Sequence, residues 1–247
     1  MTLILYDKRT DIEIVLRYPH RLARLSEPGL APGKSAPITL SVKARVASKI
    51  DLLKKQMKLM TRSGEKLLLV DDNTGVASMG YLKDLTGDPS TRTRTPRTEY
   101  VLPVDGIFIC DSGVLGVVRG AEECTLSGGA VVVSDDGACG GRAVALGERD
   151  ANIYFSVEED LLLPESNYTV WVRAKDTDHV VDDLTIGVYD ERRVASLVST
   201  TESLTGEYAW YDLDLFVSER EFILPCIRKN TQARNTISVD LIALVPL

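Results

Sequence analysis

Ala-Glu-Glu-Cys-Thr at residues 121–125 and Ser-Val-Asp-Leu-Ile-Ala at residues 238–243 bracket the second half of this chain. About ten short alternating or apolar runs lie between them, separated by turns rich in Gly, Asp, Asn and Ser. Such a pattern is typical of an antiparallel β-sandwich whose first and last strands lie side by side. The sequence therefore predicts that this half folds as a module of its own.

The strands of this sandwich are predicted from period-two alternation and from the turn residues between the runs. In Tyr168-Thr-Val-Trp-Val-Arg, alternation places Tyr168, Val170 and Val172 on one face of the strand. Trp171 and Arg173 then lie on the other face. The predicted strands cover residues 130–134, 143–146, 153–157, 168–174, 184–189, 194–199, 208–216, 221–227 and 237–245.

The first half predicts strands followed by one helix. Strands are expected at residues 3–6, 12–16 and 38–42, with a Pro- and Gly-rich loop at 26–37 before the third. A helix is predicted after the third strand because apolar residues recur there every three or four positions, at Val46, Ile50, Leu53, Met57 and Met60. Gly64 is expected to end this helix.

Two hairpins are expected after the helix. The first joins residues 66–70 to 76–85 through the turn Asp-Asp-Asn-Thr-Gly. The second has an exposed tip at residues 86–97, whose arginines make it basic, and it returns through strands at 98–104 and 106–109. The tip has no aromatic residue for base stacking, so we expect it to order against a neighbouring subunit and not to bind nucleic acid.

Charge divides the chain in the same place as the strand pattern. Residues 1–120 carry 19 Lys+Arg against 13 Asp+Glu, a net charge of +6, and residues 121–247 carry 10 against 23, a net charge of −13. The split supports two domains, 1–118 and 119–247, and allows opposite surfaces to attract in an assembly, although drift in surface charge is an equal alternative.

Targeting signals and cysteine pairs are not evident. No apolar stretch is long enough to span a membrane, and the charged N-terminus does not resemble a signal peptide. We therefore expect a protein that is made and kept in a cytoplasm or released by a route other than secretion. The four cysteines show no short spacing, and reduced thiols are the first expectation. A bridge between Cys124 and Cys139 is the alternative.

The element order of the first half resembles the split-barrel domain of tailed-phage tail tube and distal tail proteins. The stretches that carry the resemblance are residues 45–55, 65–70, 79–85 and 96–104, in the order strand, charged helix, short hairpin, long Thr/Arg hairpin and strand. The resemblance implies a ring, expected to be a hexamer, that contacts tube and hub proteins at a viral tail tip or baseplate. Such a protein is located in the virion and assembles in the host cytoplasm.

The second half resembles carbohydrate-binding jelly rolls with a galactose-binding-like fold. The similarity runs from Ala121-Glu-Glu through residues 140–147, 153–157, 167–174 and 207–213 to Val239-Asp-Leu-Ile-Ala-Leu. It implies a structural Ca²⁺ that pins the two ends of the module together, held by Glu122 and Asp240 with Glu123 as a helper. Oxygen ligands of this kind are what Ca²⁺ prefers, and surface carboxylates are the alternative.

Trp171, Arg173 and Tyr211 are the candidate glycan-binding residues. A flat aromatic side chain can cover the apolar face of a sugar ring, although large aromatics at strand centres more often belong to the core. Asp176, Asp178, Asp182 and Asp183 crowd another loop. That loop is an oxygen-rich candidate without EF-hand spacing, so a solvated acidic loop is the favoured interpretation.

The sequence thus predicts a mainly β protein with an N-terminal split β-barrel carrying one α-helix and a C-terminal antiparallel β-sandwich, a jelly roll. It has no catalytic or nucleotide-binding motif, so no enzyme is expected. The leading hypothesis is a structural protein of a viral tail tip whose sandwich binds host surface glycans. The alternative is a non-viral carbohydrate-binding protein with a calcium-stabilised jelly roll.

Overall fold

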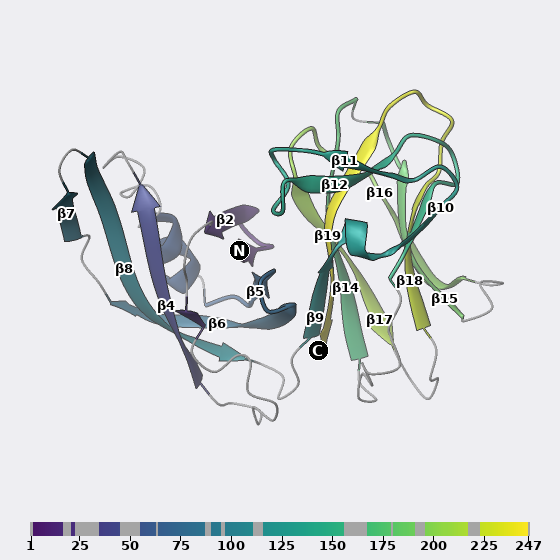
Figure 1. Ribbon diagram of the computed structural model, residues 1–247. Helices are drawn as coiled ribbons and strands as arrows, with labels where there is room; N and C mark the ends of the chain where they lie inside the picture. Colours follow the sequence, from purple (N-terminus) through teal and green to yellow (C-terminus); the bar gives the residue numbers. More distant parts are fainter. Residues whose placement is uncertain are drawn as a thin grey trace. The chain divides into compact units, whose positions relative to one another are not determined.

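The chain forms two compact units, Met1–Gly116 and Val117–Leu247, both built almost entirely of antiparallel strands (Figure 1). The computed structural model describes residues 2–16, 21–22, 35–44, 55–62, 64–86, 90–94, 97–110, 116–155, 167–178, 180–190, 196–216 and 223–246. This architecture confirms the predicted mainly β fold class. Within those ranges, no helix has the length and apolar character needed to cross a membrane.

The first unit is a curled antiparallel sheet. Four of its strands lie in the order β6-β5-β1-β2. β8 pairs with β6, and it also pairs with β4 and with β7. β3 pairs with β4. The strands are β1 (Leu3–Asp7), β2 (Ile12–Leu16), β3 (Arg21–Leu22), β4 (Ser35–Ala44), β5 (Leu67–Asp71), β6 (Val76–Thr86), β7 (Ser90–Arg94) and β8 (Arg97–Cys110).

Apolar runs place two strands of the first unit in its interior. Every residue of β1 and of β5 is buried, as expected of strands covered on both faces. The helix occupies residues 55–62 in the described part, and its Met57 and Met60 are buried, which confirms the last two positions of the predicted apolar stripe. Gly64 follows with a φ of +64°, the left-handed conformation that suits a helix end. Val46, Ile50 and Leu53 lie outside the described residues.

The basic tip of the first unit is more ordered than predicted. Residues 90–94, expected within an exposed loop, form β7 and pair with the start of β8, from Ser90 opposite Val101 to Arg94 opposite Arg97. The strand was not predicted because strands were identified by apolar residues at alternate positions, and residues 90–94 contain no apolar residue. Threonine is nevertheless a good strand former.

The second unit is a jelly roll made of two sheets. One sheet runs β11-β12-β19-β14-β17, with β9 also paired to β19, and the other runs β10-β13-β18-β15-β16. The first sheet contains β9 (Gly116–Gly120), β11 (Val131–Ser134), β12 (Arg142–Leu146), β14 (Asn167–Asp176), β17 (Ala209–Phe216) and β19 (Ile237–Pro246). The second contains β10 (Thr125–Ser127), β13 (Asn152–Tyr154), β15 (Leu184–Asp190), β16 (Ser196–Glu202) and β18 (Ile223–Lys229).

The hydrophobic core of the jelly roll takes alternate residues from both sheets. Val170, Val172 and Ala174 of β14 pack in one cluster with Ile186 of β15 and Ile227 of β18. The predicted alternation is confirmed for Val170 and Val172, because Trp171 and Arg173 lie outside that cluster. Tyr168, predicted on the same face as the two valines, is buried but is not part of the cluster. Polar residues of β14 are therefore available on the sheet face opposite the core.

The first and last strands of the second unit lie side by side, but the first strand is β9, just before the predicted residues 121–125. β9 pairs with β19 from Gly120 opposite Leu241 to Val117 opposite Leu244. Ala-Glu-Glu of the bracket forms a 3-10 turn, η1 (Ala121–Glu123), directly after β9. The register between β14 and β19 shifts at Arg173 and Ala174, whose partners are Leu241 and Val239. Asp240 is thus the extra residue of a β-bulge, a feature that re-aims side chains.

Candidate functional site

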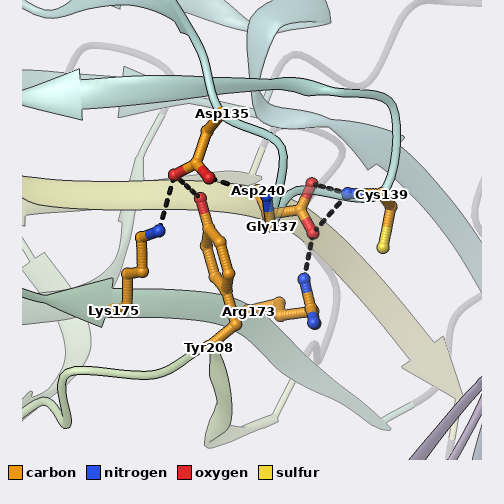
Figure 2. A network of polar contacts seen from close by, with 7 residues as sticks. All are labelled: Asp135, Gly137, Cys139, Arg173, Lys175, Tyr208 and Asp240. Atoms are coloured by element: carbon orange, nitrogen blue, oxygen red, sulfur yellow. Dashed lines mark hydrogen bonds and ion pairs between the residues drawn. The ribbon is translucent and has the colours of Figure 1, made fainter.

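A polar cluster lies on the first sheet of the jelly roll. Asp135, Gly137 and Cys139 come from the loop between β11 and β12, Arg173 and Lys175 from β14, Tyr208 from the residue before β17, and Asp240 from the bulge of β19 (Figure 2). Arg173 and Lys175 share a face because they are two residues apart on one strand. Asp240 follows Val239, which faces the core, so alternation along β19 places Asp240 on this same outer face.

Asp240 is the buried centre of this polar cluster, with 1% of its surface exposed. Its Oδ2 accepts a hydrogen bond from Nη1 of Arg173, and the two side chains form an ion pair. The backbone N–H of Cys139 donates to Oδ1 at 3.0 Å and to Oδ2 at 3.2 Å. Burial raises the pKa of Asp240 above its ordinary value, while Arg173 and the N–H of Cys139 act in the opposite direction.

Asp135 is the second anion of the cluster and lies nearer to solvent. Its Oδ2 accepts hydrogen bonds from Lys175 Nζ at 2.7 Å and from Tyr208 Oη at 2.9 Å, and its Oδ1 accepts one from the N–H of Gly137 at 2.9 Å. Partial burial acts to raise the pKa of Asp135, but these three donors outweigh it and hold the pKa below its ordinary value. The carboxylate is therefore ionised at neutral pH.

Tyr208 contacts both ion pairs of the cluster, because its ring lies against Arg173 and Lys175 and its hydroxyl donates to Asp135. The ring centroid lies 4.6 Å from the guanidinium carbon of Arg173 and 4.4 Å from Nζ of Lys175, distances at which cations are attracted to a π-face (Figure 2). Burial raises the pKa of Tyr208, and its hydrogen bond to Asp135 raises it further. The phenol thus remains a neutral donor. Tyr208 is not among the predicted site residues, although its place two residues before Trp210 on an alternating strand puts both aromatic rings on one face.

The predicted glycan-binding residues occupy structural positions. Trp171 is 3% exposed and Arg173 is 5% exposed, so little of either side chain is open to solvent, and their part in glycan binding stays a prediction. Tyr211 is half-buried against the hydrophobic core, and its hydroxyl accepts a hydrogen bond from the N–H of Thr205 at 3.0 Å. The alternative interpretation, that large aromatics at strand centres belong to the interior, fits Trp171 and Trp210.

The predicted metal ligands are brought only partly together. Glu122 lies close enough to Asp240 for the two carboxylates to influence one another, whereas Glu123 is exposed. Burial raises the pKa of Glu122, to which Glu123 and Asp240 contribute, while its own backbone N–H and Arg142 oppose the shift. Among the residues with described positions, no three His, Cys, Asp or Glu side chains converge in a way that could hold a metal ion.

Two aspartates of the acidic loop are buried, contrary to the expectation of a solvated loop. Asp176 and Asp183 have no exposed surface, and Nδ2 of Asn235 donates to one oxygen of each at 2.8 Å. Asp176 also accepts hydrogen bonds from the N–H groups of Asp178 and Val180, and Asp183 accepts one from the N–H of Thr231. These contacts join the loops before β15 and β19, so the two aspartates are structural.

No disulfide bond joins Cys124 to Cys139, so the predicted alternative of a bridge between them is wrong. Burial raises the pKa of Cys124 to about 12, helped by Glu123 and Glu122 and opposed by Arg119. A thiol of this kind is poorly reactive.

Comparisons with known proteins match solved carbohydrate-binding modules. A family 35 module from Clostridium thermocellum is 22% identical with a TM-score of 0.39, and the match covers 51% of this chain and 96% of that one. The C-terminal family 6 module of a laminarinase from Zobellia galactanivorans is 13% identical with a TM-score of 0.40, over 52% and 98%. A family 36 module in complex with calcium and xylotriose is 12% identical with a TM-score of 0.38, over 52% and 98%. No protein-family profile matches the chain, and no curated protein matches it.

Proposed function

We propose that the protein binds carbohydrate through its jelly roll and is not an enzyme. The observation that carries this proposal is the fold of Val117–Leu247 itself. Two antiparallel sheets enclose one core, and the strands include the segments on which the resemblance to carbohydrate-binding jelly rolls rests. The proposal agrees with the non-viral alternative drawn from the sequence, but the calcium of that alternative is not part of it.

Within the jelly roll, the rim of the polar cluster is the place where we expect a glycan to bind. The Lys175 and Asp135 side chains keep 19% and 17% of their surface exposed, and Tyr208 between them is half-buried. A partly exposed ring beside a carboxylate and an ammonium offers an apolar contact together with hydrogen-bond acceptors and donors for sugar hydroxyls. Trp171 and Arg173, both buried, would support this rim from below without touching the ligand.

Glycan arrays probed with the full chain test the proposal, followed by isothermal titration with each glycan that binds. Lys175→Met removes the positive charge at the rim and keeps most of the aliphatic side chain. We expect it to weaken glycan binding by about tenfold, because a hydrogen bond from a charged group is lost. Lys58→Met is the matched control, because it makes the same change at an exposed position of the helix in the first unit, and binding should persist. Absence of binding to every plant, microbial and animal glycan on the array would remove carbohydrate binding from consideration.

A structural role at a viral tail tip is the second candidate, favoured by the first unit. That unit contains, in the predicted order, β4, the helix at 55–62, the β5–β6 hairpin and the basic β7–β8 hairpin. The proposed assembly is a ring, expected to be a hexamer located in the virion, with the jelly roll displayed to host glycans. Light scattering gives the solution mass, and negative-stain imaging gives the shape. A strict monomer at high concentration, with no ring in the images, would argue against this candidate.

A further inference from the structure

Among the described residues, the junction between the two ends of the jelly roll brings together fewer than three of the carboxylates that calcium prefers. Ca²⁺ takes about six to eight oxygens, most of them from carboxylates and carbonyls. Glu122 and Glu123 are neighbours in the 3-10 turn η1, where successive side chains point about 120° apart. Glu122 therefore lies half-buried near Asp240 while Glu123 is exposed to solvent. Of the three predicted carboxylates, only those of Glu122 and Asp240 lie near one another.

A protein cation already neutralises the carboxylate that the metal would need most. Nη1 of Arg173 bonds Oδ2 of Asp240, and the N–H of Cys139 lies against both oxygens. The side chains of Arg173 and Asp240 are only 6% and 1% exposed, so neither can turn to water without losing the other. A divalent ion seated on Asp240 would stand close to the guanidinium, and the two positive charges would repel.

The arginine is fixed from its other side as well. Its guanidinium lies over the ring of Tyr208, and Tyr208 is held by Asp135, which Lys175 and the N–H of Gly137 hold in turn (Figure 2). The contacts tie the loop between β11 and β12 to β14, to the start of β17 and to β19. The hydrogen bond from the N–H of Cys139 to Asp240 joins residues that are 101 positions apart in the chain.

We propose that the guanidinium of Arg173 takes the place of a structural calcium ion at this junction, so that the jelly roll closes without a divalent metal. The Glu122, Glu123 and Asp240 set predicted from the resemblance does not fit a calcium site. Arg173 supplies the positive charge to Asp240, and Asp240 holds the loop at Cys139 against the last strand. The inference concerns how the fold is held together and does not depend on which glycan, if any, the protein binds.

Melting of the full chain with calcium chloride and with EDTA tests the proposal on the natural sequence. A structural ion present at about a hundred times its Kd would raise the melting temperature by roughly 10 °C. We expect a difference within about 1 °C, and no saturable heat in titrations with calcium chloride. A fall of several degrees in EDTA, or calcium binding that Asp240→Asn abolishes, would overturn the proposal.

Substitutions in the ion pair test the role of Arg173 directly. Arg173→Met and Asp240→Asn should each lower the melting temperature by roughly 10 °C, because each leaves a buried partner uncompensated, and the double variant should lose less than the sum. Arg142→Met is the matched control, an exposed arginine beside Glu122 that should change little. An unchanged melting temperature in Arg173→Met would contradict the proposal. If that variant does not fold, the calcium and EDTA measurements on the natural chain decide alone.

Discussion

Asn235 joins two buried carboxylates, and its replacement should cost more stability than any surface change in the same loop. Its Nδ2 donates at 2.8 Å to Asp176 and at 2.8 Å to Asp183, and all three residues are at most 2% exposed. A hydrogen bond to a charged group contributes about 1.5–3 kcal/mol, so Asn235→Ala should lose about 3–6 kcal/mol. That is a large share of the roughly 5–15 kcal/mol that stabilises a typical domain.

Asn235→Asp should make the stability of the second unit depend on pH. The variant places a third carboxyl group against two buried carboxylates, so the pKa of the introduced group is raised in the folded state. The folded protein then binds a proton at pH values where the unfolded chain has released it. The stability of the variant therefore recovers as the pH falls through the raised pKa of the introduced group. At neutral pH the loss should at least equal that of Asn235→Ala.

Urea denaturation followed by tryptophan fluorescence measures these losses in the second unit alone, because both tryptophans of the chain, Trp171 and Trp210, lie there. Gln232→Glu is the matched control. It adds a negative charge in the same loop at an exposed position, and its effect should stay within about 0.5 kcal/mol. The reasoning would be refuted if Asn235→Asp lost less than about 1 kcal/mol at neutral pH, since the buried bridge would then contribute little.

Three further predictions concern the polar cluster and the cysteine beside it. Tyr208→Phe removes the hydroxyl that donates to Asp135 at 2.9 Å, and urea denaturation should show a loss of about 1–2 kcal/mol; no loss would mean that water replaces the bond. The pKa of Asp135 lies below its ordinary value of 3.8, so the stability that this carboxylate contributes is present above that value and is lost as pH falls below it. Acid titration of unfolding in the natural chain and in Asp135→Asn should therefore converge at the acid end, and parallel curves would exclude this linkage. Cys124, with its pKa raised to about 12, should be alkylated at mildly alkaline pH far more slowly in the folded protein than in urea, as peptide mass mapping can measure; equal rates would show that the thiol is not protected.

Periodicity in the sequence was a good guide wherever the pattern depended on one strand or one turn. The alternation along β14 predicted that Val170 and Val172 enter the core, and the turn at 71–75 predicted the β5–β6 hairpin. The same criterion failed at β7, whose alternating Thr and Arg contain no apolar side chain to mark a buried face.

Candidate site residues were predicted less well, because their roles depend on neighbours that are distant in the chain. Trp171 and Arg173 were correctly placed on the face opposite the core, but their burial could not be derived from the strand to which they belong. Asp176 and Asp183 were assigned to a solvated loop because local composition does not reveal Asn235, which lies more than fifty residues further along and bridges them.

The sequence by itself determined the mainly β class, the bracket of first and last strands and the face on which each residue of β14 lies. These follow from local rules, since a strand alternates its side chains whatever surrounds it. Only the tertiary structure decided the partner of Asp240. Asp240 is the extra residue of a one-residue bulge in β19 and bonds Arg173 of β14, and the pairing of these two strands has no signature in the residues of either one. An expected calcium ligand is for that reason the anion of a buried ion pair.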